Sequence, residues 1–247
     1  MKRLALALLL AHGSLWSPPA AAWTFDWAGH VELDAEGLSS DDADKRHAAV
    51  LDLAKYDVAL TEKFLMTALS DKEEKVRTAA AKALGQAGSQ AAVPVMIDWL
   101  GSPDAKTKMA AAEALGDIGG AEATAALTRS LGDSDSGVRQ KAVKALGAIG
   151  KRGNAGVVIA LIPRLDDDKA DVKNATIQML EELGDRRAVI PLVAKFSETS
   201  RETRRLAVRA IGRLGDPSAV PALIRLINDP DEEVRTAAGI AAIWPSE

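Results

Sequence analysis

Residues 138–150 have the sequence VRQKAVKALGAIG, and similar phrases return along most of the chain. The basic residue at the second position of this phrase recurs every 31 residues, with one insertion of three residues. Seven copies follow from these bases, which are Arg46, Arg77, Lys108, Arg139, Lys173, Arg204 and Arg235. A unit that repeats at a fixed period of this length is typical of a solenoid, in which each copy stacks on the next.

Each copy has the apolar periodicity of an amphipathic helix. In the copy quoted above, Leu146 and Ile149 follow Arg139 by seven and ten residues, which places them on one side of a helix. Glycines stand eight and eleven residues after most of the bases, as Gly147 and Gly150 do here. Because glycine favours the left-handed conformation, both positions predict a C-terminal cap. We refer to this helix as helix B.

A second amphipathic segment, helix A, precedes the copies from the second onward. Its leucines stand twelve and eight positions ahead of the base, and a proline is expected in its first turn in three copies (Pro94, Pro191 and Pro221). Pro163 instead falls inside a helix A and predicts a kink. The pattern predicts one lone helix B followed by six A–B pairs, which together form a repeat domain over residues 42–247.

These phrases resemble the HEAT repeat, in particular the short bacterial type also found in phycobilin lyases, over roughly residues 42–244. The resemblance implies an all-α, right-handed α-α superhelical solenoid of helix pairs. It also implies that a polar residue six positions before each base ties neighbouring turns together by hydrogen bonds. Ser102 before Lys108 departs from the acidic pattern, so we expect this pair to be the weakest rung. For function the resemblance implies little, since such solenoids serve unrelated tasks.

The first 22 residues have the features of a secretory signal peptide. Two basic residues, Lys2 and Arg3, precede an apolar run from Leu4 to Ala11, and an A-x-A pattern ends at Ala22. The run is too short to span a bilayer, and no later stretch approaches the ~20 apolar residues that a membrane span needs. We therefore expect cleavage near Ala22 and a mature protein that is periplasmic or secreted.

Composition excludes several classes of protein. The chain has 31 lysines and arginines against 35 aspartates and glutamates, a net charge of −4 that does not suggest a nucleic-acid partner. The absence of cysteine excludes disulfides, thiolate zinc sites, cysteine nucleophiles and a lipidated cysteine.

Motifs of catalysis are absent from the sequence. Only His30 and His47 remain after removal of the signal peptide, neither belongs to an H-E-x-x-H motif, and no G-x-S-x-G or phosphate-binding loop occurs. We therefore expect no catalytic, cofactor-binding or metal-binding residues. A lyase-like or chaperone-like enzyme subunit that acts on a cofactor-bearing protein stays open as an alternative because of the resemblance.

Residues 23–41 form an acidic and aromatic segment that contains Trp23, Phe25 and Trp27. Two interpretations stay open: a cap in which the rings cover the exposed side of the first helix, and an arm that docks on a partner. At the other end of the chain, Ile240, Ile243 and Trp244 stand where a terminal helix should carry charge. They predict a sticky surface that could form a homodimer, unless Trp244 and Pro245 fold back as a plug.

Partner-binding residues are predicted on two elements. Arg201, Arg205, Arg209 and Arg213 recur every four residues and so lie along one side of the sixth helix B. They predict a surface for carboxylates or phosphates, although Glu182 and Glu232 could neutralise its two ends. Trp99 in a helix A is a second candidate anchor. The sequence thus predicts an exported, non-catalytic scaffold that binds an acidic protein through its curved surface, with binding of an acidic polymer as a further alternative.

Overall fold

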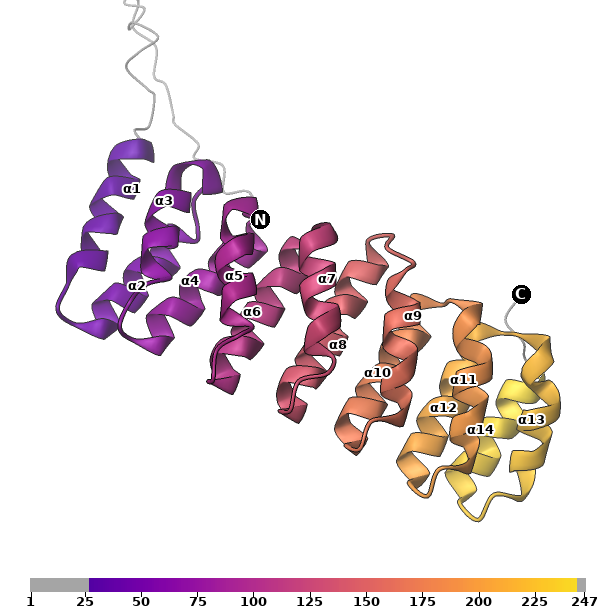
Figure 1. The fold of residues 1–247 in the computed structure, drawn as a ribbon. Helices are drawn as coiled ribbons and strands as arrows, with labels where there is room; N and C mark the ends of the chain where they lie inside the picture. Colours follow the sequence, from indigo (N-terminus) through magenta and orange to yellow (C-terminus); the bar gives the residue numbers. More distant parts are fainter. Residues whose placement is uncertain (1–26, 244–247) are drawn as a thin grey trace, which may run out of the picture.

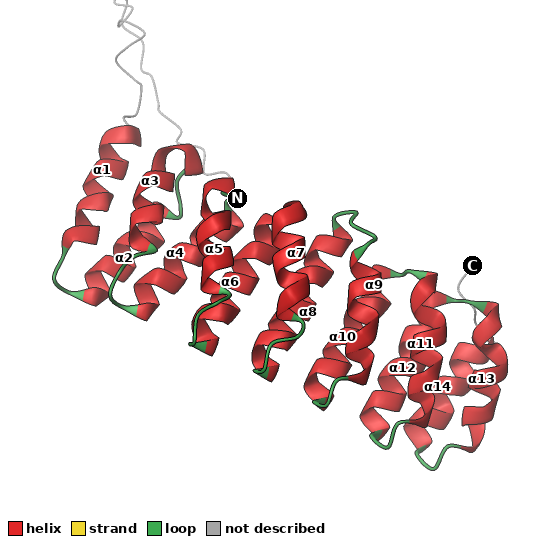
Figure 2. Cartoon of the chain, viewed as in Figure 1, coloured by secondary structure: helices red, strands yellow, loops and turns green. Residues whose placement is uncertain are grey.

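The computed structural model describes residues 27–243, and in that range the chain forms helices and turns without a strand. Figure 1 shows helix pairs that follow one another in chain order and build one elongated array, and Figure 2 shows the short loops that join them. The A helices are α1 (Trp27–Glu36), α3 (Val58–Ala68), α5 (Val93–Trp99), α7 (Gly120–Ser130), α9 (Val157–Leu161), α11 (Val189–Ala194) and α13 (Val220–Arg225). The B helices are α2 (Ala43–Leu53), α4 (Glu74–Gln86), α6 (Ala105–Ile118), α8 (Ser136–Lys151), α10 (Ala170–Leu183), α12 (Arg201–Leu214) and α14 (Glu232–Ile243).

Short 3-10 turns flank several of these helices. They comprise η2 (Gly37–Ser39), η3 (Gln90–Ala92), η4 (Ile162–Asp166), η5 (Arg186–Ala188), η6 (Lys195–Ser197), η7 (Pro217–Ala219) and η8 (Leu226–Asn228). No helix in residues 27–243 has the length and apolar character needed to cross a membrane.

The stacked helix pairs of this range confirm the all-α solenoid that the repeat predicts.

Leucines of the predicted column form the core between successive pairs. Leu53, Leu84, Leu115, Leu146 and Leu180 have no exposed surface, and they stand at the same position of five consecutive B helices. Alanines of the same helices fill the remaining space, which lets neighbouring B helices approach closely. Burial of a leucine stabilises the fold by about 1.5 to 3 kcal/mol relative to leaving it exposed, so this column carries much of the stability.

The glycine that stands eight residues after four of the bases is not a cap, contrary to the prediction. Gly116 lies inside α6, and a methyl group at its Cα would come 2.8 Å from the Cα of Ala145 on α8. Gly85 is in the same situation against Ala114, again at 2.8 Å from a backbone atom. These glycines are needed because the backbones of successive B helices touch there.

The second glycine of the phrase is the predicted cap. Gly88, Gly119, Gly184 and Gly215 have positive φ angles between 59° and 77°. The three inserted residues extend α8 to Lys151, so Gly150 becomes helical and the positive φ, 106°, moves to Gly153. The insertion thus lengthens one helix without changing the stacking of the next pair.

Pro163 changes the type of helix rather than bending a continuous one. Helix α9 ends at Leu161, and the chain continues as the 3-10 turn η4 with Pro163 at its second residue. Helices α11 and α13 also end in 3-10 turns, although those turns span three residues and η4 spans five. The proline therefore extends a transition that the repeat makes without it.

Helix α1 occupies the segment predicted to be a cap. Val31 and Ala35 of α1 are buried, and the helix packs on α2 and α3. The first B helix, expected to be lone, thus has an A-like partner, which makes seven pairs in residues 27–243. Trp27 is 56% exposed and meets the ring of Tyr56 edge-on at 6.0 Å. The signal peptide of residues 1–22, together with Trp23, Phe25, Trp244 and Pro245, lies outside the described residues.

We expect Gly116→Ala to lower the free energy of unfolding by about 1 to 3 kcal/mol, because the added methyl group overpacks the α6–α8 contact. Gly239→Ala in α14 is the matched control, since nothing lies within 4 Å of the methyl group there. That substitution should gain about 0.5 to 1 kcal/mol from helix propensity. Denaturant melts followed by circular dichroism measure both values, and equal effects would contradict a backbone contact at Gly116.

Candidate functional site

Ion pairs join most of the repeats to the next along one edge of the array. The base of one copy binds the acid 25 residues later, or 28 across the insertion, rather than the acid six residues before it. We call this series the ladder. Its rungs in the described residues are Arg46–Asp71, Lys108–Asp133, Arg139–Asp167, Lys173–Glu198 and Arg204–Asp229.

Arg139 shows how an arginine rung is built. Its Nε and NH2 groups donate to the two carboxylate oxygens of Asp167, both at 2.8 Å. Its NH1 group donates to the carbonyl oxygens of Asp133 and Ser134, at 2.9 and 3.2 Å, within its own copy. One guanidinium therefore ties together the loops of two copies, as the resemblance implied. The interaction is structural, since the side chains of Arg139 and Asp167 are only 9% and 1% exposed.

The carboxyl group of Asp167 is held in its ionised form. Burial by itself raises its pKa, but the hydrogen bonds from Arg139 and from the backbone amide of Lys169 outweigh burial and lower the pKa to about 2. The unfolded chain has the higher, ordinary pKa. The stabilisation is therefore complete above that ordinary value and is lost as the pH falls through the folded-state pKa.

We expect Asp167→Asn to cost about 1 to 3 kcal/mol at neutral pH, because it removes a charged hydrogen-bond partner of Arg139. The difference from the wild type should shrink as the pH falls below about 4, where the unfolded carboxyl group protonates. Denaturant melts between neutral and acidic pH measure it, with the exposed Asp117→Asn as control. A cost independent of pH would show that Asp167 acts by packing and not by charge.

The interrupted rung lies between Arg77 and Ser102, and not between Ser102 and Lys108 as predicted. Lys108 binds Asp133 at 2.7 Å, and both side chains are largely buried. Ser102 stands 25 residues after Arg77, where the other copies provide a carboxylate. Within residues 27–243, no carboxylate binds Arg77 or the last base, Arg235.

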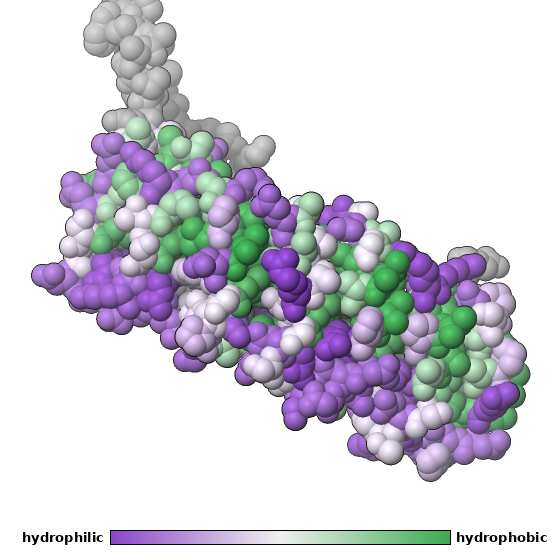
Figure 3. Space-filling view, viewed as in Figure 1, coloured by the Kyte–Doolittle hydropathy of each residue, from purple (hydrophilic) through white to green (hydrophobic). Residues whose placement is uncertain are grey.

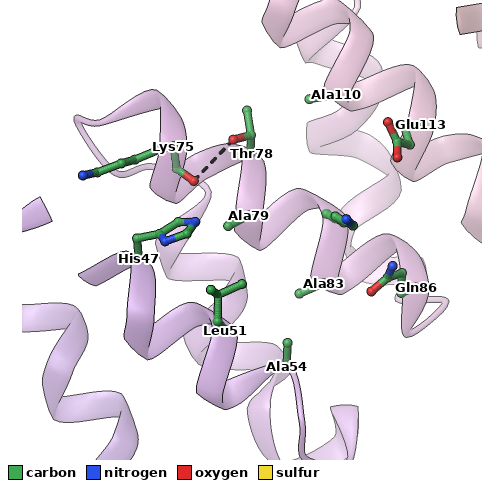
Figure 4. Close-up of a pocket in the computed structure, with 11 residues that line it drawn as sticks. His47, Leu51, Ala54, Lys75, Thr78, Ala79, Ala83, Gln86, Ala110 and Glu113 are labelled. Carbon is green, nitrogen blue, oxygen red and sulfur yellow. Dashed lines mark hydrogen bonds between the residues drawn. The ribbon is translucent and has the colours of Figure 1, made fainter. Parts of the chain in front are cut away.

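The exposed side chains of the B helices form a second surface, which we call the B-helix face. It comprises the positions three residues before and one, five and nine residues after each base, and on it lies a groove of about 590 Å³ between α2, α4 and α6. Figure 4 shows His47 and Leu51 on the first of these helices and the small side chains of Ala79 and Ala83 on the second. The lining residues are His47, Leu51, Ala54, Lys75, Thr78, Ala79, Lys82, Ala83, Gln86, Ala110 and Glu113.

Alanines make this groove hollow, and charged side chains form its rim. Lys75 binds Asp44, and Glu113 binds Lys141 at 2.7 Å, so two rim charges are fixed by neighbouring helices. Lys82 is exposed on the rim. Sequence reasoning did not find this groove, although the spacing of the arginine stripe already marked the same positions in the sixth helix B. In residues 27–243, no three histidine, aspartate or glutamate side chains come together to form a metal site.

The arginine stripe lies on the B-helix face, but carboxylates neutralise much of it. Arg209 and Arg213 bind Glu181 of α10 at 2.9 and 3.1 Å, and the Glu181 side chain is only 2% exposed. Arg205 binds Glu202 at 2.9 Å, and Arg201 lies 3.6 Å from Asp231.

The carboxylates expected to neutralise the stripe were misidentified. Glu182 binds Lys151 instead of the stripe, and Glu202, Asp231 and Glu181 take the place expected for Glu182 and Glu232. The stripe therefore supports binding of an acidic polymer less well than its sequence suggested. Reversing the charge of Arg209 would also place a second negative charge beside the buried carboxylate of Glu181.

Trp99 and the C-terminal isoleucines lie away from the groove. Trp99 ends α5 and is partly buried beside Arg77 and Ser102. Ile240 and Ile243 of α14 are 62% and 77% exposed. The A helices expose isoleucines as well, and Ile190 on α11 is 82% exposed. Figure 3 shows hydrophobic side chains over α9 and α11 and a hydrophilic lower edge, along which the loops of the ladder run.

Stacked helix pairs, a leucine column and an inter-repeat ladder define an α-helical solenoid. The family model for HEAT repeats matches residues 35–107, 93–181 and 189–244, so the chain belongs to the HEAT-repeat family. No curated protein sequence matches it significantly.

Solved structures share this fold. The Escherichia coli protein YibA is 21% identical with a TM-score of 0.59, and the match covers 87% of this chain and 81% of YibA. The complex of CpcE and CpcF of phycocyanin lyase from Nostoc sp. PCC7120 is 25% identical with a TM-score of 0.52, over 93% of this chain and 91% of that one. An engineered protein is 23% identical with a TM-score of 0.53, over 86% and 67%.

Proposed function

We propose that the protein is an exported, non-catalytic scaffold that binds another protein through the B-helix face. The groove between α2, α4 and α6 is the observation that carries this proposal, because it is a concave surface that needs no rearrangement to form. Its walls are helices fixed by the leucine column and the ladder. A preformed surface loses little conformational entropy on binding, which favours its use for recognition.

The groove fits an amphipathic segment of a partner. Its alanine floor and Leu51, which is 49% exposed, offer apolar contact, whereas the exposed Lys82 offers positive charge at the rim. An acidic side chain beside an aliphatic one would satisfy both. Further along the same face, Arg201 is 76% exposed and could extend the contact to an acidic surface.

We expect the double variant Leu51→Asp/Lys82→Glu to reduce capture of the native partner at least about tenfold, a loss of about 1.4 kcal/mol. Both side chains are exposed, so circular dichroism should be unchanged. Crosslinking in cells followed by mass spectrometry identifies the partner and measures its capture. The same data reveal crosslinks between two copies, which would support the homodimer through Ile240 and Ile243.

Ile190→Asp on the A-helix side and Arg201→Glu at the far end of the B-helix face are the controls. Loss of capture in Ile190→Asp, with capture retained in the groove variant, would assign binding to the opposite face. Loss in Arg201→Glu alone would assign it to the outer end of the arginine stripe.

Export belongs to this proposal because residues 1–22 have the pattern of a signal peptide. We expect the mature protein in the periplasmic or secreted fraction, with Trp23 as its first residue after cleavage following Ala22. Sequencing of its N-terminus after fractionation measures this. A cytoplasmic protein that retains Met1 would contradict export and leave the groove proposal unaffected.

A lyase-like subunit is the second candidate, favoured by the similarity to the CpcE and CpcF complex along most of the chain. Such a subunit would change the mass of the captured partner by the mass of a cofactor. The mass spectrum of the partner, recorded with and without this protein, separates the two functions.

A further inference from the structure

At the interrupted rung, Arg77 and Ser102 each keep the local backbone hydrogen bonds that the residues of a complete rung make. The NH1 group of Arg77 donates to the carbonyl oxygens of Asp71 and Lys72 at 2.7 and 2.9 Å, as the NH1 group of Arg139 does in its own loop. In the complete arginine rungs, a guanidinium anchored in this way directs Nε and NH2 at the loop of the following copy. The same edge of Arg77 therefore faces the loop that contains Ser102.

Ser102 has the backbone environment of a rung acid. Its Oγ accepts a hydrogen bond from the amide of Asp104 at 3.2 Å. Asp133 and Asp229 make the same contact with the amide two residues later, at 2.9 Å each. The loop thus has the turn of a complete rung and lacks only the carboxylate.

An open hollow of about 440 Å³ lies where that carboxylate would be. Arg77, Ser102 and Thr107 line it together with Trp99, whose indole is one of the few large aromatic surfaces of the chain. Arg164 and Lys195 stand at the position of Trp99 in two later copies. Each of them contacts the rung acid three residues further along the chain, Asp167 at 3.5 Å and Glu198 at 3.7 Å. The indole therefore stands next to the place of the absent carboxylate.

Asp98 also lines the hollow, but it does not complete the rung. Its side chain is exposed, and no ion pair joins it to Arg77 in residues 27–243. Because the side chain is exposed, the high dielectric constant of the surrounding water weakens its repulsion of an incoming anion. The Nε and NH2 groups of Arg77 make no hydrogen bond to the described residues.

We propose that this hollow, which we call the vacant rung, receives an aspartate or glutamate side chain of a partner protein. The chain itself shows the expected geometry: in the rungs of Arg46, Arg139 and Arg204, Nε and NH2 bind the two oxygens of one carboxylate at 2.6 to 2.9 Å. This bidentate contact is specific to a planar acceptor. The apolar part of the partner's side chain packs against Trp99, and aromatic anchors of this kind often dominate an interface.

The inference adds a second contact to the proposed scaffold and assigns a chemistry to its partner. It involves none of the residues of the groove on the B-helix face. Its failure therefore leaves the groove proposal standing, and failure of the groove variant leaves the vacant rung standing.

The test uses the intact protein and an aspartate side chain with blocked ends, N-acetyl-aspartate amide, with N-acetyl-asparagine amide as the neutral probe. At constant ionic strength, we expect the aspartate probe to shift the NMR signals of the Arg77 Nε–H and the Trp99 indole N–H saturably, in the millimolar range. The asparagine probe should not. Equal shifts from both probes, or none from either, would overturn the proposal.

Ser102→Asp supplies the missing carboxylate from within the chain. We expect it to raise the denaturation midpoint above that of Ser102→Asn and to abolish the shifts caused by the aspartate probe. Arg77→Gln should abolish the same shifts, whereas Asp98→Asn should preserve or strengthen them. Binding that persists in Ser102→Asp, a midpoint no higher than that of Ser102→Asn, or binding lost in Asp98→Asn would each refute the vacant rung.

Discussion

Apolar surface on both sides of each helix pair is the constraint on which the rest of this structure depends. A single pair cannot bury both sides, so every pair is stable only between neighbours. The leucine column satisfies this requirement, and the glycines at Gly85 and Gly116 set how closely successive B helices approach. Because these contacts are the same from copy to copy, the array is regular, and its exposed faces inherit that regularity.

The ladder adds direction to this stacking. Hydrophobic contact alone allows neighbouring pairs to slide or rotate, whereas a guanidinium such as Arg139 fixes two loops by four hydrogen bonds to Asp167, Asp133 and Ser134. A rung also costs desolvation of two charged groups, which the hydrogen bonds between them must outweigh. A copy that lacks the acid, as at Ser102, keeps the fold because the leucine column is intact, and its arginine becomes available for other contacts.

Function in such an array depends on positions that packing does not use. On the B-helix face these are the residues three positions before and one, five and nine positions after each base, which vary from His47 and Leu51 in the first copy to Arg205 and Arg209 in the sixth. Small residues between α2, α4 and α6 hollow this face into a groove. The two proposed contacts, groove and vacant rung, thus lie on different sides of the N-terminal half of the solenoid.

The repeat period by itself determined the helices, the leucine column and the cap at the second glycine, because these depend on spacing within one copy. It did not determine contacts between copies, which depend on the rotation and distance from one pair to the next. For that reason the acid bound by Arg139 was assigned to the wrong loop, Gly116 was taken for a cap, and Glu181 was overlooked as the partner of Arg209. Helix α1 lacks the repeat phrase, so only its packing on α2 and α3 revealed it as part of a pair. The groove and the vacant rung also depend on contacts between copies. Each is formed by residues about one repeat apart, which only the stacked structure brings together.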